Sequence, residues 1–161
     1  KEIAVYDLLD KLDIPFRRVD HVHADTMEMC QEIDQALGQD ICKNLFLCNR
    51  QKTKFYLLLM PGDKPFKTKD LSAQIGSSRL SFGGAEDMER LLNLTPGSVT
   101  VLGLMYDPDC QVTLLIDQDL YQQSAFGCHP CINTSTVQFS TADFREKLLP
   151  ALGHPVTLVQ L

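Results

Sequence analysis

The sequence contains no apolar run that approaches the roughly 20 residues a helix needs to cross a bilayer. Its longest apolar stretch extends from Phe55 to Met60, a length that predicts a buried strand. The first ten residues contain neither the apolar segment nor the small-residue cleavage site of a secretory signal. We therefore expect a cytoplasmic protein with no membrane partner.

The sequence also lacks the short motifs of several enzyme classes. It has no phosphate-binding P-loop, no dinucleotide fingerprint and no nucleophile elbow. It has no internal repeat, low-complexity tract or linker either. With 161 residues, of which 44% are hydrophobic and 22% charged, the chain is expected to form one compact domain over residues 1–161.

Metal-binding and redox motifs are incomplete. Six cysteines are present, but only Cys128 and Cys131 form a Cys-x-x-C pair, and structural zinc normally needs a second such pair. A thioredoxin-like pair should begin a helix after a strand, whereas residues 132–139 are typical of a strand. His21 and His23 share a strand face, but no third ligand is specified. We expect no metal, no cofactor and free thiols.

Positive charge is scarce overall but unevenly distributed. The formal net charge is −6, which does not indicate a DNA-binding protein. Yet eight of the 15 Lys and Arg residues lie in one central stretch, namely Lys43, Arg50, Lys52, Lys54, Lys64, Lys67, Lys69 and Arg79. This stretch could bind a phosphate backbone with salt-sensitive affinity, or it could be an ordinary solvated face.

Hydrophobic periodicity predicts a mixture of helices and strands. Helices are predicted over 3–12, 25–37, 69–75, 85–92 and 141–149, and strands over 16–22, 43–48, 54–60, 112–116, 132–139 and 156–159. The second and third strands are separated by a short polar segment, which predicts a hairpin. Because helices and strands do not alternate strictly, we expect an α+β fold with a mixed, largely antiparallel sheet.

Lys43 is the first candidate for chemistry. It precedes the apolar residues Leu45–Leu47, so a predicted strand fixes the base of its side chain. A lysine placed in this way can hold an anion or a polarised carbonyl, although a surface lysine is the commoner case. Gly97-Ser98, and Gly127 ahead of His129, could expose backbone N–H groups to an ester oxygen, although glycine turns often only redirect the chain.

Short segments spread over nearly the whole chain carry a resemblance to a known family. They are Val19–His21 with Thr26, Lys43–Leu47, Arg79–Phe82, Leu94–Thr100, Cys128–Pro130 with Asn133–Thr136, Ser140–Asp143 and Gly153–His154. In this order they resemble the YbaK/ProX family of aminoacyl-tRNA deacylases, and most closely the branch that removes alanine from proline tRNA. One such motif would be weak, but several in the correct order are specific.

The resemblance implies a curved sheet flanked by helices, and hydrolysis of the ester that joins a wrong amino acid to the terminal adenosine of tRNA. It implies Lys43 as the catalytic residue, holding the substrate carbonyl or the adjacent phosphate. Water, assisted by a substrate ribose hydroxyl, would be the nucleophile, without a metal. The implied substrate-binding residues are Asn44, Phe46, Arg79, Ser81, Gly97, Ser98 and His129.

The implied partner is the acceptor end of mischarged proline tRNA, with prolyl-tRNA synthetase as a further partner. A synthetase site built for proline cannot strongly reject a smaller amino acid, because a missing methylene is worth only about 1–3 kcal/mol. A second, small pocket can hydrolyse alanine while it excludes proline by size. The sequence therefore predicts a trans-acting deacylase of Ala-tRNA(Pro).

Two positions depart from the family pattern. Val101 stands where the family loop has proline, at the fifth place counted from Gly97, and Gly83-Gly84 replaces the Ser-Pro that leads into the following helix. These departures bear on the choice of amino acid. Two alternatives therefore stay open: a Cys-tRNA(Pro) deacylase, and a non-catalytic module that binds a tRNA acceptor end or a synthetase.

Overall fold

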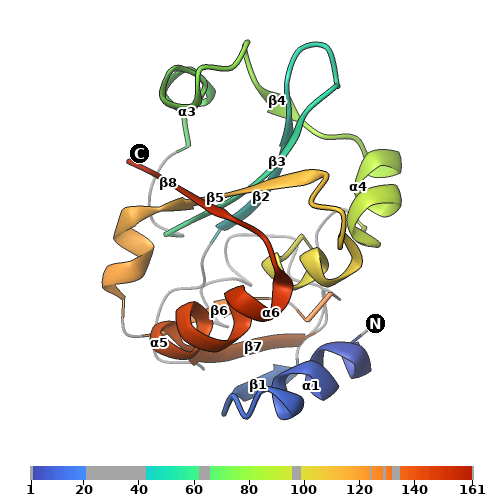
Figure 1. Ribbon diagram of the computed structural model, residues 1–161, viewed down its shortest axis with the longest axis vertical. Coiled ribbons are helices and arrows are strands. Elements are labelled where there is room, and N and C mark those ends of the chain that lie inside the picture. Colours follow the sequence, from blue (N-terminus) through green and yellow to red (C-terminus); the bar gives the residue numbers. More distant parts are fainter. Residues whose placement is uncertain are drawn as a thin grey trace.

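The computed structural model describes residues 2–20, 43–61, 66–95, 99–123, 125–128, 130–131 and 135–160. Helices and strands are mixed along these ranges without regular alternation (Figure 1). The described strands form two sheets, one of five strands and one of three. The predicted α+β class is confirmed, with the difference that the strands divide between two sheets where one curved sheet was expected.

The larger sheet is mixed and has the strand order β4-β2-β3-β5-β8. Strands β2 (Lys43–Cys48) and β3 (Phe55–Met60) form the predicted antiparallel hairpin, with Lys43 opposite Met60 and Cys48 opposite Phe55. The short β4 (Ser81–Phe82) pairs with the end of β2. On the other side, β5 (Val112–Asp117) and β8 (Val156–Val159) run parallel to β3.

The smaller sheet is antiparallel and has the order β1-β7-β6. Its strands are β1 (Arg17–Asp20), β6 (Ala125–Cys128) and β7 (Ser135–Ser140). The predicted strand 16–22 is confirmed over the four residues of β1, and β1 pairs with β7 from the far end of the chain. Helix α1 (Glu2–Lys11) lies beside this sheet in Figure 1, and its Tyr6 ring stacks on Phe16 at 5.6 Å between centroids.

Five helical regions connect the strands within the described part of the chain. Helices α3 (Thr68–Ile75) and α4 (Ala85–Leu92) lie where the sequence predicts them and end at the left-handed residues Gly76 and Asn93. The predicted helix over 141–149 is confirmed as a continuous helical region, α5 (Thr141–Asp143), a π-helical turn η3 (Phe144–Leu148) and α6 (Leu149–Leu152). Two 3₁₀ helices, η1 (Val101–Tyr106) and η2 (Gln118–Gln122), complete the set.

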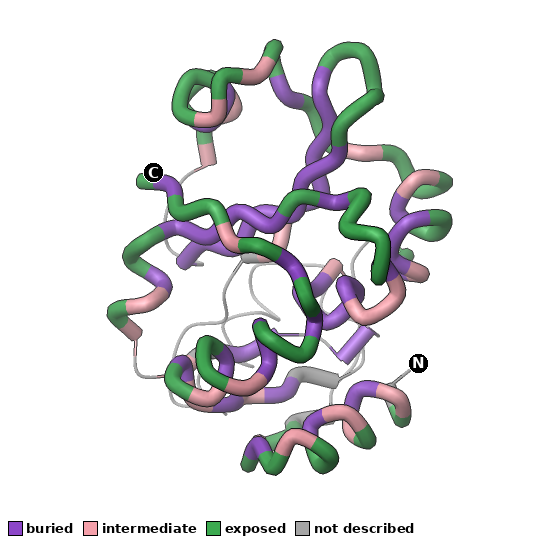
Figure 2. Tube along the Cα trace, in the orientation of Figure 1, coloured by how far each residue is buried: buried purple, intermediate pink, exposed green. Residues whose placement is uncertain are grey.

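Two hydrophobic cores lie on opposite faces of the larger sheet. Residues alternate between them along each strand, so Leu57 and Leu59 enter one core and Leu58 and Met60 the other. The first core is also filled by α1, α4, η1, β5 and the smaller sheet, and the second by α3. All six residues of β3 are therefore buried, and Figure 2 shows this burial beside the exposed turn of the hairpin.

Some elements differ from the sequence expectation. β4, β6 and the 3₁₀ helix η1 were not predicted. The predicted strand 132–139 begins at Ser135 in the described part of the chain. The predicted helix 25–37 lies outside the described residues. Within the described ranges, no helix is long and apolar enough to span a bilayer.

Candidate functional site

Lys43 is the first residue of β2, at the end of the larger sheet that lies away from the hairpin turn. The pairing of Lys43 with Met60 fixes its backbone, because β3 is held in turn by β5 on its other side. The sequence expectation that a strand fixes the base of this lysine is therefore confirmed.

The neighbouring Asn44 binds the segment that follows the glycine loop. Its side-chain Oδ1 accepts a hydrogen bond from the backbone N–H of Val101 at 3.0 Å. One residue earlier, the Thr100 hydroxyl accepts from the N–H of Leu102 at 3.3 Å and so caps η1. A proline, which the sequence resemblance led us to expect at position 101, has no N–H and could not donate to Asn44. Val101 therefore supplies a contact that the sequence did not reveal.

Phe46 is a core residue. Its ring is 2% exposed and stacks on Phe55 at 5.7 Å between centroids. The backbone N–H of Gly83 donates to the carbonyl of Phe46 at 2.9 Å, and a Cβ on Gly83 would lie 2.2 Å from the ring. The structure thus gives Phe46 a packing role and explains one of the two departing glycines. Direct contact between Phe46 and a substrate stays a prediction.

Arg79 and Ser81 lie near the opposite end of β2. Ser81 pairs with Cys48, and its Oγ lies 3.6 Å from the cysteine Sγ. Arg79 is exposed and lines a pocket of about 450 Å³ together with Thr68, Lys69 and Ser72. From Lys43 to Cys48 is five residue steps of about 3.4 Å, or roughly 17 Å. Among the described residues, the predicted site residues therefore lie at both ends of β2, with Lys43 and Asn44 at one end and Arg79 and Ser81 at the other.

Gly97, Ser98 and His129 lie outside the described residues. The chain next to His129 is described, and there Cys128 ends β6 while Cys131 lies before β7 with a φ of 65°. The cysteine pair therefore lies between two antiparallel strands, so it does not begin a helix as a thioredoxin-like pair would. Cys48, Cys110, Cys128 and Cys131 form no disulfide, and all but Cys110 are buried.

The Cys131 thiol interacts electrostatically with the hydroxyl of Tyr106, the last residue of η1. Burial raises the pKa of the Tyr106 hydroxyl, the Cys131 thiol raises it further, and a hydrogen bond with the Asn93 side chain lowers it. Cys131 therefore belongs to the packed interior between η1 and the smaller sheet. Among the described residues, no group of three or more His, Cys, Asp or Glu side chains could hold a metal ion.

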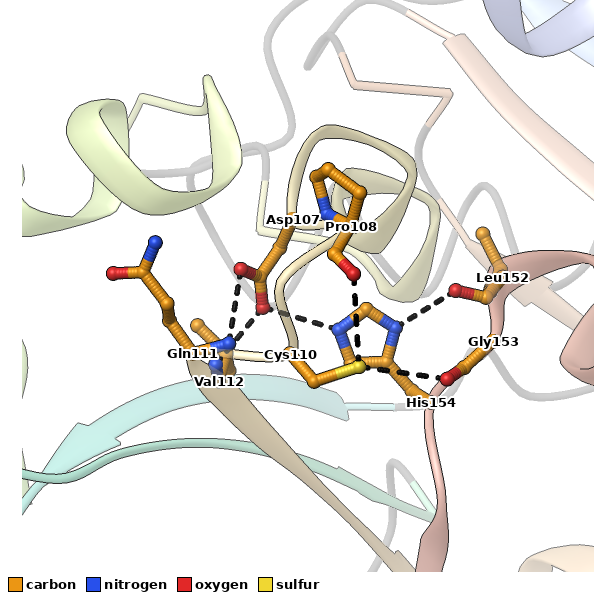
Figure 3. A network of polar contacts seen from close by, with 8 residues as sticks. All are labelled: Asp107, Pro108, Cys110, Gln111, Val112, Leu152, Gly153 and His154. Carbon is orange, nitrogen blue, oxygen red and sulfur yellow. Dashed lines mark hydrogen bonds and ion pairs between the residues drawn. The ribbon is translucent and has the colours of Figure 1, made fainter.

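A buried hydrogen-bonded pair, Asp107 and His154, lies at the C-terminal end of η1 (Figure 3). Nε2 of His154 donates to Oδ2 of Asp107 at 3.0 Å, and Nδ1 lies 3.0 Å from the carbonyl oxygen of Leu152. The Asp107 carboxylate also accepts from the N–H groups of Gln111 and Val112 at 3.0 and 2.9 Å. His154 is 5% and Asp107 2% exposed, so the pair stabilises the junction of η1, β5 and β8 and faces no solvent.

Residues 21–147 match the aminoacyl-tRNA editing domain family, which is most of the chain. The chain belongs to the aminoacyl-tRNA editing domain family. It is 32% identical over 158 residues to the "Prolyl-tRNA editing protein ProX" of Acetoanaerobium sticklandii, covering 98% of this chain and 96% of that protein. The resemblance to the YbaK/ProX family that the sequence motifs indicated is confirmed.

Other relatives also match this chain over nearly its full length. The "Prolyl-tRNA synthetase associated domain-containing protein 1" of Danio rerio is 27% identical over 94% of this chain and 83% of its own. The fold matches the crystal structure of a candidate trans-editing enzyme for prolyl tRNA synthetase, with a TM-score of 0.70, 17% identity and coverage of 99% and 96%. An editing domain of this family implies a tRNA substrate.

Two structural features near the predicted site residues could not be read from the sequence: the hydrogen bond from the Val101 N–H, and the position of Lys69 beside Arg79. The Val101 N–H could have been suspected only from the departure at that position, since a backbone donor leaves no other signal. Lys69 was counted in the central basic stretch, but its proximity to Arg79 depends on how α3 folds back over the larger sheet.

Proposed function

We propose that this editing domain hydrolyses Ala-tRNA(Pro) in trans, in the cytoplasm and without a metal or other cofactor. The observation that carries the proposal is the end-to-end match to a protein named for prolyl-tRNA editing. Because the match covers 98% of one chain and 96% of the other, residues 1–161 are proposed to act as a single editing domain. Prolyl-tRNA synthetase is the proposed further partner.

In this proposal the Lys43 end of β2 receives the aminoacyl ester. Lys43 holds the ester carbonyl or the adjacent phosphate as a point charge. Asn44 fixes the start of η1 through Val101, which is three residues after Ser98 in the sequence. His129 orients the substrate at the pocket wall. Phe46 maintains the packing beneath this end of the strand.

The proposed reaction is an ester hydrolysis. A water molecule adds to the carbonyl carbon, and the neighbouring ribose hydroxyl of the terminal adenosine assists by accepting and passing on its proton. The bond between the carbonyl carbon and the ribose oxygen then breaks, the ribose oxygen takes up a proton, and free alanine leaves. Positioning and charge stabilisation supply the rate enhancement, so no strong protein nucleophile is required.

The test is release of labelled alanine from Ala-tRNA(Pro), with Pro-tRNA(Pro) and Cys-tRNA(Pro) measured alongside. We expect fast loss of alanine, retention of proline, and a decrease of about 100-fold or more in Lys43→Ala. Lys11→Ala, an exposed lysine on α1, is the matched control and should behave like the wild type.

The remaining outcomes separate the alternatives. Preferential loss of cysteine would favour a Cys-tRNA(Pro) deacylase. Binding of tRNA without hydrolysis of either mischarged species would contradict the proposal and favour a non-catalytic acceptor-end or synthetase-binding module.

A further inference from the structure

The 3₁₀ helix η1 contacts three segments that carry or adjoin proposed site residues. Its first contact is with β2, where the Val101 N–H donates to the side-chain oxygen of Asn44 at 3.0 Å. The residues from Val101 to Leu104 are buried, so the helix is fixed inside the first core. Of its six residues, only Tyr106 carries a hydroxyl. The other two contacts both involve this tyrosine.

The second contact is with the end of α4. Asn93 ends this helix in the left-handed conformation, with a φ of 55°, and its N–H donates to the Glu89 carbonyl at 3.0 Å. The Asn93 side chain forms a hydrogen bond with the Tyr106 hydroxyl. Because Asn93 lies four residues before Gly97 in the sequence, this bond fixes the chain ahead of the proposed substrate-binding loop.

Gly103 allows α4 and η1 to approach closely at this junction. Leu94 is fully buried, and a Cβ on Gly103 would lie 2.6 Å from Cδ1 of Leu94 and 3.3 Å from Cβ of Leu92. A side chain at position 103 would therefore push the two elements apart. Its absence lets Tyr106 reach Asn93.

The third contact is with the segment between β6 and β7. Cys131 is 2% exposed, and its thiol interacts electrostatically with the Tyr106 hydroxyl. Cys131 follows His129 by two residues in the sequence, and the intervening Pro130 is also buried. Tyr106 therefore contacts both the end of α4 and the segment that carries His129.

The Tyr106 hydroxyl acts in its neutral form. Burial raises its pKa and the Cys131 thiol raises it further, against a smaller opposite effect of the Asn93 hydrogen bond. The group therefore stays protonated at neutral pH, and it can donate and accept hydrogen bonds. A neutral hydroxyl bonded to Asn93 contributes to the position of that segment and brings no charge to an ester.

We propose that Tyr106 is a positioning residue that keeps the amino-acid pocket of the deacylase small. The inference rests on the proposed function, in which Gly97, Ser98 and His129 bind the substrate. The Tyr106 hydroxyl fixes the separation between the chain ahead of Gly97 and the chain after His129. Gly103 sets how closely α4 approaches η1. Because alanine is selected against proline by size, a shift of a fraction of an ångström changes the selectivity.

The test is a double-mutant cycle. Tyr106→Phe removes the hydroxyl, and Asn93→Gly removes its partner while glycine keeps the left-handed conformation. Tyr121→Phe is the matched control, because it makes the same chemical change on a tyrosine of η2 whose ring contacts Arg145. For each protein kcat and KM are measured with Ala-tRNA(Pro) and Pro-tRNA(Pro), and urea unfolding midpoints verify folding.

Each single variant should lower the ratio of kcat/KM for alanine to that for proline about fivefold, the size of one net hydrogen bond. The double variant should lower it no further, because both changes remove the same bond. The effect should lie in kcat more than in KM, and Tyr121→Phe should behave like the wild type. A wild-type ratio in Tyr106→Phe would overturn the inference, as would losses that multiply in the double variant.

A second measurement does not depend on hydrolysis. The rate at which iodoacetamide alkylates Cys131 reports local opening, and the buried Cys48 beside Ser81 is an internal reference. In Tyr106→Phe, Cys131 should react about fivefold faster and Cys48 at an unchanged rate. No acceleration at Cys131, or equal acceleration at both cysteines, would overturn the inference. A wild type that hydrolyses neither mischarged tRNA would contradict only the proposed function, because alkylation still tests the positioning.

Discussion

Val101 illustrates how a single backbone donor can connect η1 to the strand that carries Lys43. Its N–H donates to Asn44, next to Lys43, whereas a proline, which the resemblance led us to expect at this position, has no N–H to donate. Val101→Pro should reduce kcat/KM about tenfold, because the Asn44 side chain loses the donor that ties it to η1 and the loop shifts by a fraction of an ångström. Steady-state deacylation is the measurement.

Val101→Ala is the control, because it removes buried methyl groups but keeps the N–H. It should lower stability by about 1–3 kcal/mol with a smaller effect on kcat/KM. Equal losses of kcat/KM in the two variants would show that the hydrogen bond does not position the loop.

Gly83 and Gly84 are adjacent but have different requirements. A Cβ at Gly83 would lie 2.2 Å from the Phe46 ring, while a Cβ at Gly84 has nothing within 4 Å. Gly83→Ala should therefore destabilise the fold by about 1–3 kcal/mol, and Gly84→Ala should change it by about 0.5 kcal/mol or less. Urea unfolding midpoints distinguish them, and similar midpoints would contradict the close packing of Phe46.

The sequence presents these two glycines as one departure from the family pattern, and only the structure separates them. The same holds for Phe46, which sequence comparison placed among the substrate-binding residues. Whether a strand residue contacts substrate or core depends on which elements cover each face of the sheet, and those elements lie far away along the chain.

Elements with strong local signals could be predicted from sequence. The hairpin β2–β3, helix α4 and strand β8 lie at their expected positions because periodicity and turn residues specify them locally. Strands β4 and β6 were missed because neither contains a β-branched residue, and β4 has only two residues, so their partners supply most of their stability. β4, for instance, exists through Leu47 and Cys48, more than thirty residues earlier.

The junction of η1, β5 and β8 depends on the buried pair of Asp107 and His154. His154→Ala should destabilise the fold by about 3 kcal/mol or more, because the buried Asp107 carboxylate loses the hydrogen bond from Nε2 of His154 and the missing ring leaves a cavity. The melting temperature should fall by roughly 6–12 °C. Gln111→Ala is the control, because only the backbone of Gln111 contacts Asp107. Similar melting temperatures for the two variants would contradict this role.

At the scale of the molecule, charge is separated along β2. The exposed cations at the hairpin-turn end of the larger sheet, Arg50, Lys52, Lys54, Lys67, Lys69 and Arg79, contrast with a net charge of −6. The field of the protein should therefore orient an approaching tRNA before contact. We expect the association rate constant to fall steeply with added salt while the dissociation rate constant changes less, as measured by stopped-flow fluorescence. In Lys67→Gln/Lys69→Gln the salt dependence of association should weaken, and an unchanged dependence would contradict steering by this surface.

The division of the site between two ends of β2 could not be predicted from sequence. Lys43, Arg79 and Ser81 all belong to recognisable motifs, but motif order along a chain gives no distances. Only the pairing of Cys48 with Ser81 shows that the Arg79 group lies at the far end of the strand.

Strand β3 has a consequence for the way the molecule opens. Each of its six residues is buried, and alternate side chains belong to different cores. Loss of packing in either core therefore exposes one face of β3 and weakens the strand against which the other core packs. The amide protons of β3 should exchange with solvent only when the whole chain unfolds, at the full free energy of unfolding. The backbone of Lys43, paired with Met60 at the end of that strand, is then tied to the slowest-exchanging unit of the protein.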